Sequence, residues 1–244
     1  MAERTATRSR RKPAGGRAPN LKWERELAET GARWVIGCDE VGRGAIAGPV
    51  AIGMVVVDLE SRPPRGLRDS KLLPQPRREQ LAPLVDRWAL HASVGMASNE
   101  EIDAIGLTAA LGLAGARALL GLLEGGLPEA EAAEAVVLLD GNSDYLTRAL
   151  APAGVPCTPR VTTRIKADMT CASVSGASVL AKVTRDRLMI DSHDTHPHYG
   201  WVSNKGYGSP THWAAIDAWG ASPLHRHTWL RTPSLFDLEE AEPL

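Results

Sequence analysis

Cysteine and aromatic residues are scarce in this sequence of 244 residues, which contains three Cys, three Tyr and one Phe. Cys38, Cys157 and Cys171 form no CxxC pair, which argues against a structural zinc site and fits a reducing compartment. No uninterrupted apolar run approaches the roughly 18–20 residues that span a bilayer, and no hydrophobic signal segment opens the sequence. The composition therefore predicts a cytoplasmic protein that does not use a membrane.

A large excess of charge of one sign is also missing, since the formal net charge is −1. Binding to a polyanion would therefore depend on local basic patches. The ends differ from the body, because residues 1–22 hold seven Lys/Arg and one Glu whereas 237–244 hold four acidic residues. We expect a disordered basic tail over 1–30, one large domain over 31–232 and an acidic tail over 233–244. For the basic tail we prefer a solvated extension to a nucleic-acid-binding arm.

Two adjacent acidic residues stand where a short apolar segment ends. Segment 34–36 predicts a buried strand, so that Asp39 and Glu40 emerge from the core at its end. Two carboxylates about 4 Å apart repel by roughly 4 kcal/mol at an effective dielectric constant near 20, which protonation, a cation or divergent geometry must relieve. A regular strand would point the two side chains apart. A metal site that uses both needs a bend, which Gly42 and Gly44 can supply because they lack a Cβ.

The remaining elements follow from apolar periodicity and from Gly- and Pro-containing breaks. Ser98 or Asn99 with Glu101 resembles a helix cap, after which Ile102 and Ile105 should face inward. The pattern predicts strands over 50–57, 90–97, 135–139 and 161–165, and helices from about 74 to 88, 108 to 123, 170 to 190 and 209 to 219.

Two further acidic residues stand near predicted strand ends. Asp140 follows the apolar run 135–139, which suits a central strand covered on both faces. Active groups gather where central strands end, so we favour a metal ligand here over a turn residue before Gly141. Asp168 precedes the helix predicted from residue 170, where it could cap that helix and still hold a metal.

Several distinctive motifs occur in order along the chain. The first is Asp39-Glu40-Val41-Gly42-Arg43-Gly44, directly after the apolar segment. The later ones are Asp69-Ser70-Lys71-Leu72, Glu101-Ile102-Asp103, Leu139-Asp140-Gly141, Lys166-Ala167-Asp168, Ala181-Lys182-Val183-Thr184-Arg185-Asp186, Lys205-Gly206-Tyr207-Gly208 with His212, and His225-Arg226. Together they resemble the motifs of the ribonuclease HII family, and the resemblance covers roughly residues 34–232.

The resemblance implies an α/β domain with the ribonuclease H-like fold. We expect a mixed five-stranded sheet flanked by helices, in which an antiparallel meander of three strands is followed by parallel strands. A C-terminal helical cap would contact the substrate. A single-chain monomer is the expected form.

The family likeness also implies an endonuclease that hydrolyses the RNA strand of RNA-DNA hybrids. It would cut 5′ of single ribonucleotides embedded in duplex DNA, a step of ribonucleotide removal in replication and repair. Asp39, Glu40, Asp140 and Asp168 would hold two Mg²⁺ or Mn²⁺ ions, since these hard cations prefer carboxylate oxygens. Such a two-metal reaction would leave 5′-phosphate and 3′-hydroxyl ends.

The resemblance also implies that a second group of residues determines substrate selectivity. By resemblance, backbone groups of Gly42, Arg43 and Gly44 hydrogen-bond the 2′-hydroxyl that distinguishes RNA from DNA. The Tyr207 ring would stack at the neighbouring sugar, although it could instead cover an edge of the core. Lys71 is either an ordinary surface lysine or a contact to a phosphate.

Three alternatives differ from this interpretation in what they require. A non-catalytic duplex-binding protein of the same fold would lack one or more of the carboxylates. A DNA-directed nuclease of the wider superfamily would not need the Gly-Arg-Gly segment and Tyr207. The sister family ribonuclease HIII is disfavoured because the N-terminal segment is too short for the extra domain usual there.

Overall fold

The computed structural model describes residues 18–230. The acidic tail expected over 233–244 and the first 17 residues of the expected basic tail lie outside this described part.

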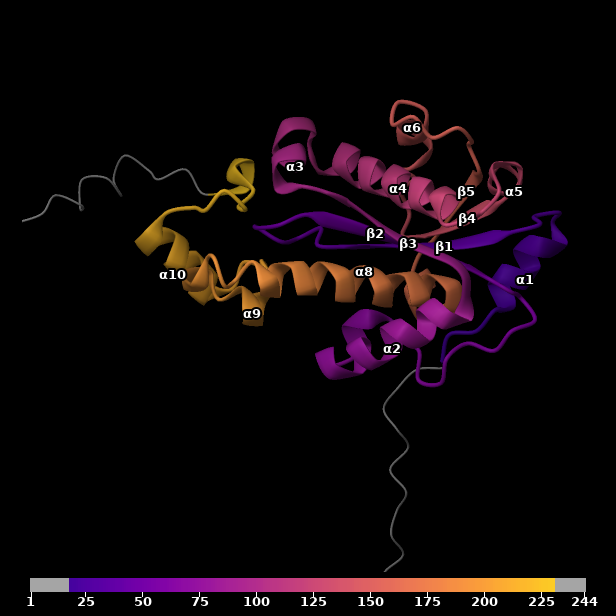
Figure 1. Cartoon of the computed structure of the whole chain (residues 1–244), viewed down its shortest axis with the longest axis horizontal. Coiled ribbons are helices and arrows are strands. Elements are labelled where there is room, and N and C mark those ends of the chain that lie inside the picture. Colours follow the sequence, from indigo (N-terminus) through magenta and orange to yellow (C-terminus); the bar gives the residue numbers. More distant parts are fainter. Residues whose placement is uncertain (1–17, 231–244) are drawn as a thin grey trace, which may run out of the picture.

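A mixed sheet of five strands forms the centre of the fold (Figure 1). The strands are β1 (Val35–Val41), β2 (Val50–Val57), β3 (Ala89–Ala97), β4 (Val136–Asp140) and β5 (Arg160–Arg164). Their order across the sheet is β3-β2-β1-β4-β5, with β1, β2 and β3 antiparallel and with β4 parallel to both β1 and β5. The predicted antiparallel meander followed by parallel strands is thus confirmed.

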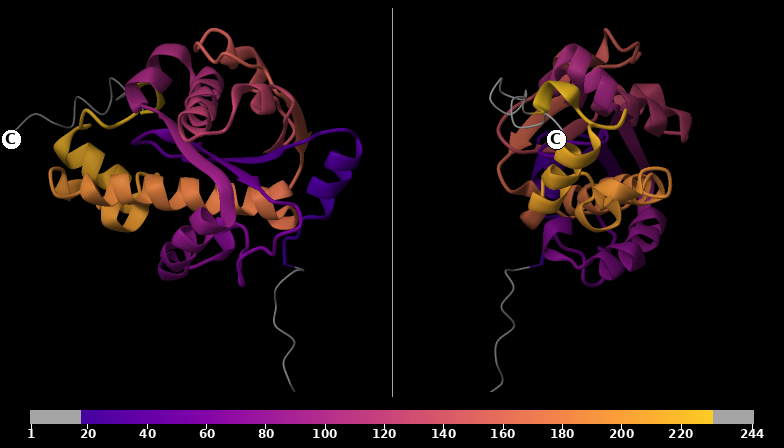
Figure 2. Two further views of the ribbon diagram at one scale, coloured as in Figure 1. Left: turned by 45° about the vertical axis from the view of Figure 1, so that its right-hand side comes forward. Right: turned by 90° about the vertical axis from the view of Figure 1, so that its left-hand side faces the viewer.

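Helices cover both faces of this sheet. In chain order the helices within residues 18–230 are α1 (Lys22–Glu29), α2 (Gln75–Trp88), α3 (Asn99–Ile105), α4 (Leu107–Glu124), α5 (Glu129–Ala133), α6 (Thr147–Leu150), α7 (Ala167–Thr170), α8 (Ala172–Asp191), α9 (Trp201–Asn204) and α10 (Pro210–Trp219), with short 3-10 turns η1 (Ser70–Leu72), η2 (Pro197–Tyr199) and η3 (His227–Trp229). Figure 1 shows α3 and α4 on one side of the sheet and α2 and α8 on the other. In the left view of Figure 2, α9 and α10 lie near one end of α8 and form the C-terminal helical part.

The long helix α8 lies unusually close to the sheet. A Cβ on Gly37 of β1 would come 2.3 Å from the backbone of Ser173, and one on Gly53 of β2 would come 2.3 Å from the carbonyl of Ala177. Side chains are therefore excluded from these two strand positions. The opposite face of β1 places Ile36 and Cys38 in the core with α4.

One helix of the described part, α4, is long and apolar enough by composition to cross a membrane. Half of the tested segment is buried within the fold, where it packs on β2 and β3. The burial identifies α4 as a core helix, which agrees with the helix predicted over 108–123.

Two local predictions are wrong and one is confirmed. The tail expected over 1–30 is too long, because residues 22–29 form α1, whose buried Glu24 accepts hydrogen bonds from the amide (2.9 Å) and hydroxyl (2.8 Å) of Ser173 at the start of α8. A carboxylate at a helix N-terminus satisfies amides that the helix leaves unpaired. Ile102 is buried, but Ile105 is 49% exposed because α3 ends there. Ser98 and Glu101 form the expected capping box.

Candidate active site

Three of the predicted acidic residues come together at one edge of the sheet. Asp39 in β1 and Asp140 at the end of β4 lie on adjacent parallel strands, which are paired through Cys38 and Leu139. Asp168 belongs to α7, shortly after β5. The Ala167 amide at the start of α7 donates to Asp140 Oδ1 at 2.7 Å. This edge corresponds to the carboxyl ends of the parallel strands, where α/β folds place their active groups.

Glu40 points away from Asp39, because β1 does not bend between them. Their register against β2 is regular, with Asp39 opposite Gly53 and Glu40 opposite Ile52, so the two side chains leave opposite faces of the strand. The bend predicted for this pair occurs only after Val41. Glu40 lies 3.2 Å from Arg43 Nη1 and accepts a 3.2 Å hydrogen bond from the hydroxyl of Tyr145. Divergent geometry therefore relieves much of the repulsion that the sequence implied.

Asp39 is a buried carboxylate with one unsatisfied oxygen. It is 1% exposed; Oδ1 accepts the amide of Glu40 at 2.8 Å, whereas Oδ2 is buried without a hydrogen-bond partner among the described residues. Burial raises the pKa of Asp39 well above its ordinary value, and the charges of Glu40 and Asp140 raise it further, while the neighbouring hydroxyl of Ser178 and the charge of Lys71 oppose the rise. An unpaired buried carboxylate oxygen costs free energy that a bound cation would recover.

The pKa of Asp168 is also raised by burial and by neighbouring carboxylates. Its pKa is raised to about 6, mainly by burial and then by Asp140 and Asp69, against the opposing charge of Lys71. The predicted capping role is wrong, because α8 is capped at Cys171 and Asp168 lies within α7. Its backbone carbonyl instead accepts the hydroxyl of Ser175 at 2.5 Å.

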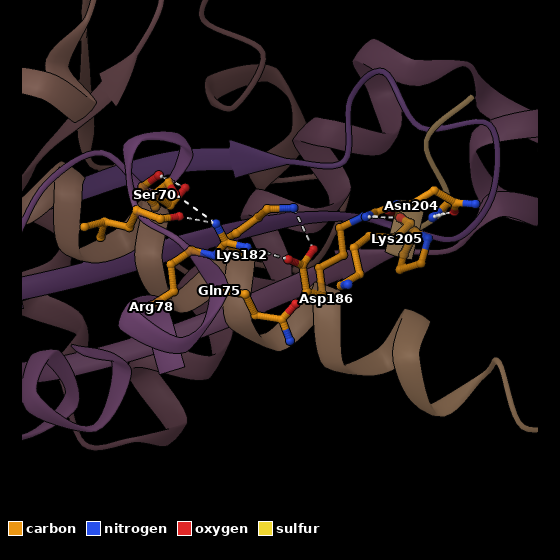
Figure 3. A network of polar contacts seen from close by, with 12 residues as sticks. Ser70, Gln75, Arg78, Lys182, Asp186, Asn204 and Lys205 are labelled. Atoms are coloured by element: carbon orange, nitrogen blue, oxygen red, sulfur yellow. Dashed lines mark hydrogen bonds and ion pairs between the residues drawn. The ribbon is translucent and has the colours of Figure 1, made fainter. Parts of the chain in front are cut away.

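Lys71 reaches into the site from η1. Its Nζ lies 3.5 Å from Asp168 Oδ2, although the side chain is 67% exposed. An ion-pair network holds this turn in place. Buried Asp186 on α8 pairs with Lys182 at 2.6 Å and with Arg78 at 3.3 Å (Figure 3). Arg78 also donates to the carbonyl of Ser70, so α2, α8 and the turn before Lys71 are fastened together (Figure 3).

The arrangement is suited to hard divalent cations without forming a complete cluster. Among the described residues, no group of three or more His, Cys, Asp or Glu side chains is placed closely enough to hold a metal ion. The donors at the edge are nonetheless all carboxylate oxygens, and Asp140 repels both Asp39 and Asp168. Carboxylate oxygens suit Mg²⁺ or Mn²⁺ better than zinc, whose sites usually include His or Cys. The assignment of all four as ligands stays a prediction.

The Gly-Arg-Gly segment turns sharply after β1. Gly42 is buried with φ +89°, and a Cβ there would come 2.2 Å from Nε of Arg185, so only glycine fits. Arg43 and Gly44 are exposed. Within residues 18–230, no hydrogen bond uses the amides of Arg43 and Gly44. The turn that follows Asp39 and Glu40 therefore exposes two residues whose amides are unpaired within the described part of the chain.

The loop that carries Tyr207 packs directly on this turn. Ala45 forms an antiparallel bridge with Tyr207, and the amides of Ile46 and Ala47 donate to the carbonyl of Gly206 at 2.9 and 3.1 Å. The half-buried Tyr207 ring lies 5.3 Å from Lys182 Nζ. The fold thus brings together the two glycine-flanked segments that the sequence separates by more than 160 positions.

Comparison with known proteins agrees with this arrangement. The family model of ribonuclease HII matches residues 36–232. The chain belongs to the ribonuclease HII family. Ribonuclease HII of Streptomyces coelicolor is 47% identical over 212 residues, which cover 86% of this chain and 83% of that protein.

Solved structures of the family share the fold. The ribonuclease HII in the PCNA complex from Archaeoglobus fulgidus has a TM-score of 0.62 and 28% identity, and the match covers 84% of this chain and 99% of that one. Bst ribonuclease HIII in complex with Mn²⁺ has a TM-score of 0.59 at 23% identity, covers 78% of this chain and 63% of that one, and supports the fold alone. As a ribonuclease HII family member, the chain is an endoribonuclease that hydrolyses RNA in RNA-DNA hybrids.

Two arginines at the ribonuclease HII site were missed by sequence reasoning. Arg185 and Arg226 are both completely buried. Arg226 donates to the carbonyl of Gly42 in the Gly-Arg-Gly turn, and Arg185 donates to that of Pro49 at the end of the same connection. Both lie in motifs that carry the family resemblance, but no role was predicted for either. A signal was present, since Arg185 continues the small-residue stripe of Ala177 and Ala181 at a spacing of four residues.

Proposed function

We propose that this enzyme cuts duplex DNA on the 5′ side of a single embedded ribonucleotide, in addition to the RNA strand of hybrids. The reaction would use two Mg²⁺ or Mn²⁺ ions and leave 5′-phosphate and 3′-hydroxyl ends. The observation that carries the proposal is the unpaired, buried Oδ2 of Asp39 beside Asp140, in the strand that leads into a turn with two unpaired backbone amides. The proposed metal ligand Asp39 and the proposed donors to the 2′-hydroxyl, the amides of Arg43 and Gly44, thus belong to the same end of β1 and the turn that follows it.

The carboxylates Asp39, Glu40, Asp140 and Asp168 would hold the ions. When bound, the ions would activate the attacking water and stabilise charge on the leaving 3′ oxygen. The Ala167 amide orients Asp140 and favours its ionised form, because a carboxylate that accepts a backbone hydrogen bond is stabilised as the anion. Bst ribonuclease HIII, a protein of the same fold, has a solved structure in complex with Mn²⁺.

Lys71 would reduce the repulsion between the carboxylates in the metal-free site and would contact a phosphate of the substrate. Its ammonium opposes the repulsion that raises the pKa of Asp39 and Asp168. Because the side chain is largely exposed, it can move from Asp168 to a phosphate oxygen when a duplex and cations arrive.

Selectivity would come from the paired loops. The amides of Arg43 and Gly44 can donate hydrogen bonds to a 2′-hydroxyl oxygen. The deoxyribose of DNA has no oxygen at this position. Gly42 completes the turn, and Tyr207 would stack on the adjoining sugar at the RNA-DNA junction. Its position beside residues 45–47 supports this role over a core-edge role.

We further propose a cytoplasmic monomer that acts in ribonucleotide removal during DNA repair. The catalytic domain would begin at α1, ahead of the boundary predicted at residue 31, and extend to residue 232. α9, α10 and η3 would form its substrate-contacting C-terminal part.

The test is hydrolysis of a labelled DNA duplex that contains one ribonucleotide, with Mg²⁺, Mn²⁺ or excess EDTA. We expect a 3′-hydroxyl on the upstream fragment and a 5′-phosphate on the ribonucleotide with either metal, and no product with EDTA. Undiminished cleavage in EDTA, or 2′,3′-cyclic phosphate ends, would contradict the proposed chemistry.

A further inference from the structure

The buried Arg226 side chain is bonded only to backbone carbonyls of one loop. Its Nη2 donates to the carbonyl of Gly42 at 2.7 Å and to that of Pro49 at 3.2 Å. Its Nη1 donates to Arg43 at 3.1 Å, and its Nε donates to Gly48 at 3.1 Å. One guanidinium thus holds four carbonyls of the connection between β1 and β2.

Arg185 extends the same arrangement to the second loop. From α8 it donates to the carbonyls of Pro49 (2.8 Å), Ala47 (3.0 Å) and Lys205 (2.9 Å). The two guanidiniums share the carbonyl of Pro49 as an acceptor. Residues 42–49 and the loop of Tyr207 are therefore fixed relative to each other by buried donors.

Neither guanidinium has a carboxylate partner among the ion pairs within residues 18–230. Burying two like charges side by side is unfavourable, and the pKa of Arg226 is lowered to about 10 by burial and by the neighbouring Arg185. If these positions served only to fill the core, apolar side chains of similar volume would stabilise the fold at least as well. The planar fork of arginine is the side chain that can bind several carbonyls at once.

Peptide geometry connects Arg226 to the two free amides. In a trans peptide, the carbonyl of one residue and the amide of the next point in opposite directions. Arg226 draws the carbonyls of Gly42 and Arg43 inward, so the amides of Arg43 and Gly44 must point outward. These are the two amides that no hydrogen bond within the described residues uses.

We infer that Arg226 is a positioning residue for ribonucleotide selectivity: it aims the amides of Arg43 and Gly44, and Arg185 locks this turn to the loop of Tyr207. The inference rests on the proposed function, in which those amides meet the 2′-hydroxyl. Arg226 itself does not touch the substrate. Its loss should reduce the rate of the chemical step without weakening attachment to the duplex, because phosphate contacts lie elsewhere.

The experiment compares Arg226→Met and Arg226→Lys with wild type and with Arg187→Met, a control at an exposed position of α8. Single-turnover cleavage of a duplex with one ribonucleotide should fall about 10- to 100-fold in Arg226→Met, as expected when reacting groups are misplaced by about 1 Å. The Kd for the same duplex, measured in Ca²⁺, should stay within about twofold. Arg187→Met should match wild type in both.

Two further readouts separate positioning from general stability. Arg226→Lys keeps the charge but cannot reach four carbonyls, so its cleavage rate should resemble that of Arg226→Met. Amide hydrogen exchange should speed up over residues 42–48 in both variants and remain unchanged in β4.

Four results would overturn the inference. They are wild-type cleavage in Arg226→Met, full rescue by Arg226→Lys, a parallel loss of duplex affinity, or loss of the folded state in both variants. The last would make Arg226 a folding residue. Failure of the wild-type protein to cut the single-ribonucleotide duplex is a different result, because it rejects the proposed function itself.

Discussion

Replacing Asp168 by Asn should make the metal-free protein more stable at neutral pH. Asp168 is buried and its pKa is raised to about 6, mainly by burial and then by Asp140 and Asp69. A carboxyl group whose pKa is raised on folding destabilises the folded state while it is ionised. An amide of the same shape removes the charge, and with it the repulsion from Asp140.

The size of this effect follows from the pKa. A rise from an ordinary value of about 4 to about 6 corresponds to about 3 kcal/mol at pH values above 6. The Asn side chain must itself be buried and loses the contact with Lys71, so we take about half, or about 1.5 kcal/mol. In a domain of this size that amounts to a rise in Tm of about 3–6 °C.

Thermal unfolding in EDTA at pH 7.5 and pH 4.5 measures the effect. The sign is set by the raised pKa: the penalty is complete above about pH 6 and fades as pH falls towards about 4. The advantage of Asp168→Asn should therefore shrink at pH 4.5, and exposed Asp217→Asn should match wild type at both values. A lower Tm for Asp168→Asn at pH 7.5, or a gain that is equal at both pH values, would refute the reasoning.

Three other predictions follow from the same site. Asp39→Asn should abolish cleavage while the Kd for duplex in Ca²⁺ changes little, and near wild-type cleavage would reject Asp39 as a ligand. Tyr207→Ala should lose about tenfold to a hundredfold in single-turnover cleavage, since stacking contributes about 1–3 kcal/mol, and Tyr207→Phe should lose less; equal rates for all three proteins would exclude stacking. Deleting residues 1–17, which hold six Lys/Arg and one Glu, should raise KM at moderate salt and leave kcat unchanged. If duplex binding by the truncated and full-length proteins depends identically on salt concentration, this segment does not contribute to binding.

The sheet and its acidic edge were predictable because their signals are local. The apolar runs of β2 and β4 need cover on both faces, and each is found in a buried strand. Asp39 and Asp140 follow such runs, so their meeting at one sheet edge follows from strand direction. The capping box of Ser98 and Glu101 was predictable for the same reason.

The missed features depend on contacts between distant segments. α1 is short and polar on average, and it is held by Glu24 at the start of α8, more than 140 residues away. The divergence of Asp39 and Glu40 depends on the regular pairing of β1 with β2. Arg226 resembles any surface arginine in sequence, because its acceptors are carbonyls of residues 42–49, which a side-chain pattern does not reveal.

The most direct measurement compares three duplexes that differ at one nucleotide, which carries a 2′-hydroxyl, a hydrogen or a 2′-O-methyl group. Single-turnover cleavage in Mg²⁺ is followed with a label on the modified strand. We predict one cut, 5′ of the ribonucleotide, in the first duplex and none in the other two, because only the 2′-hydroxyl fits against the amides of Arg43 and Gly44. Comparable cleavage of the all-DNA duplex would contradict the proposed recognition.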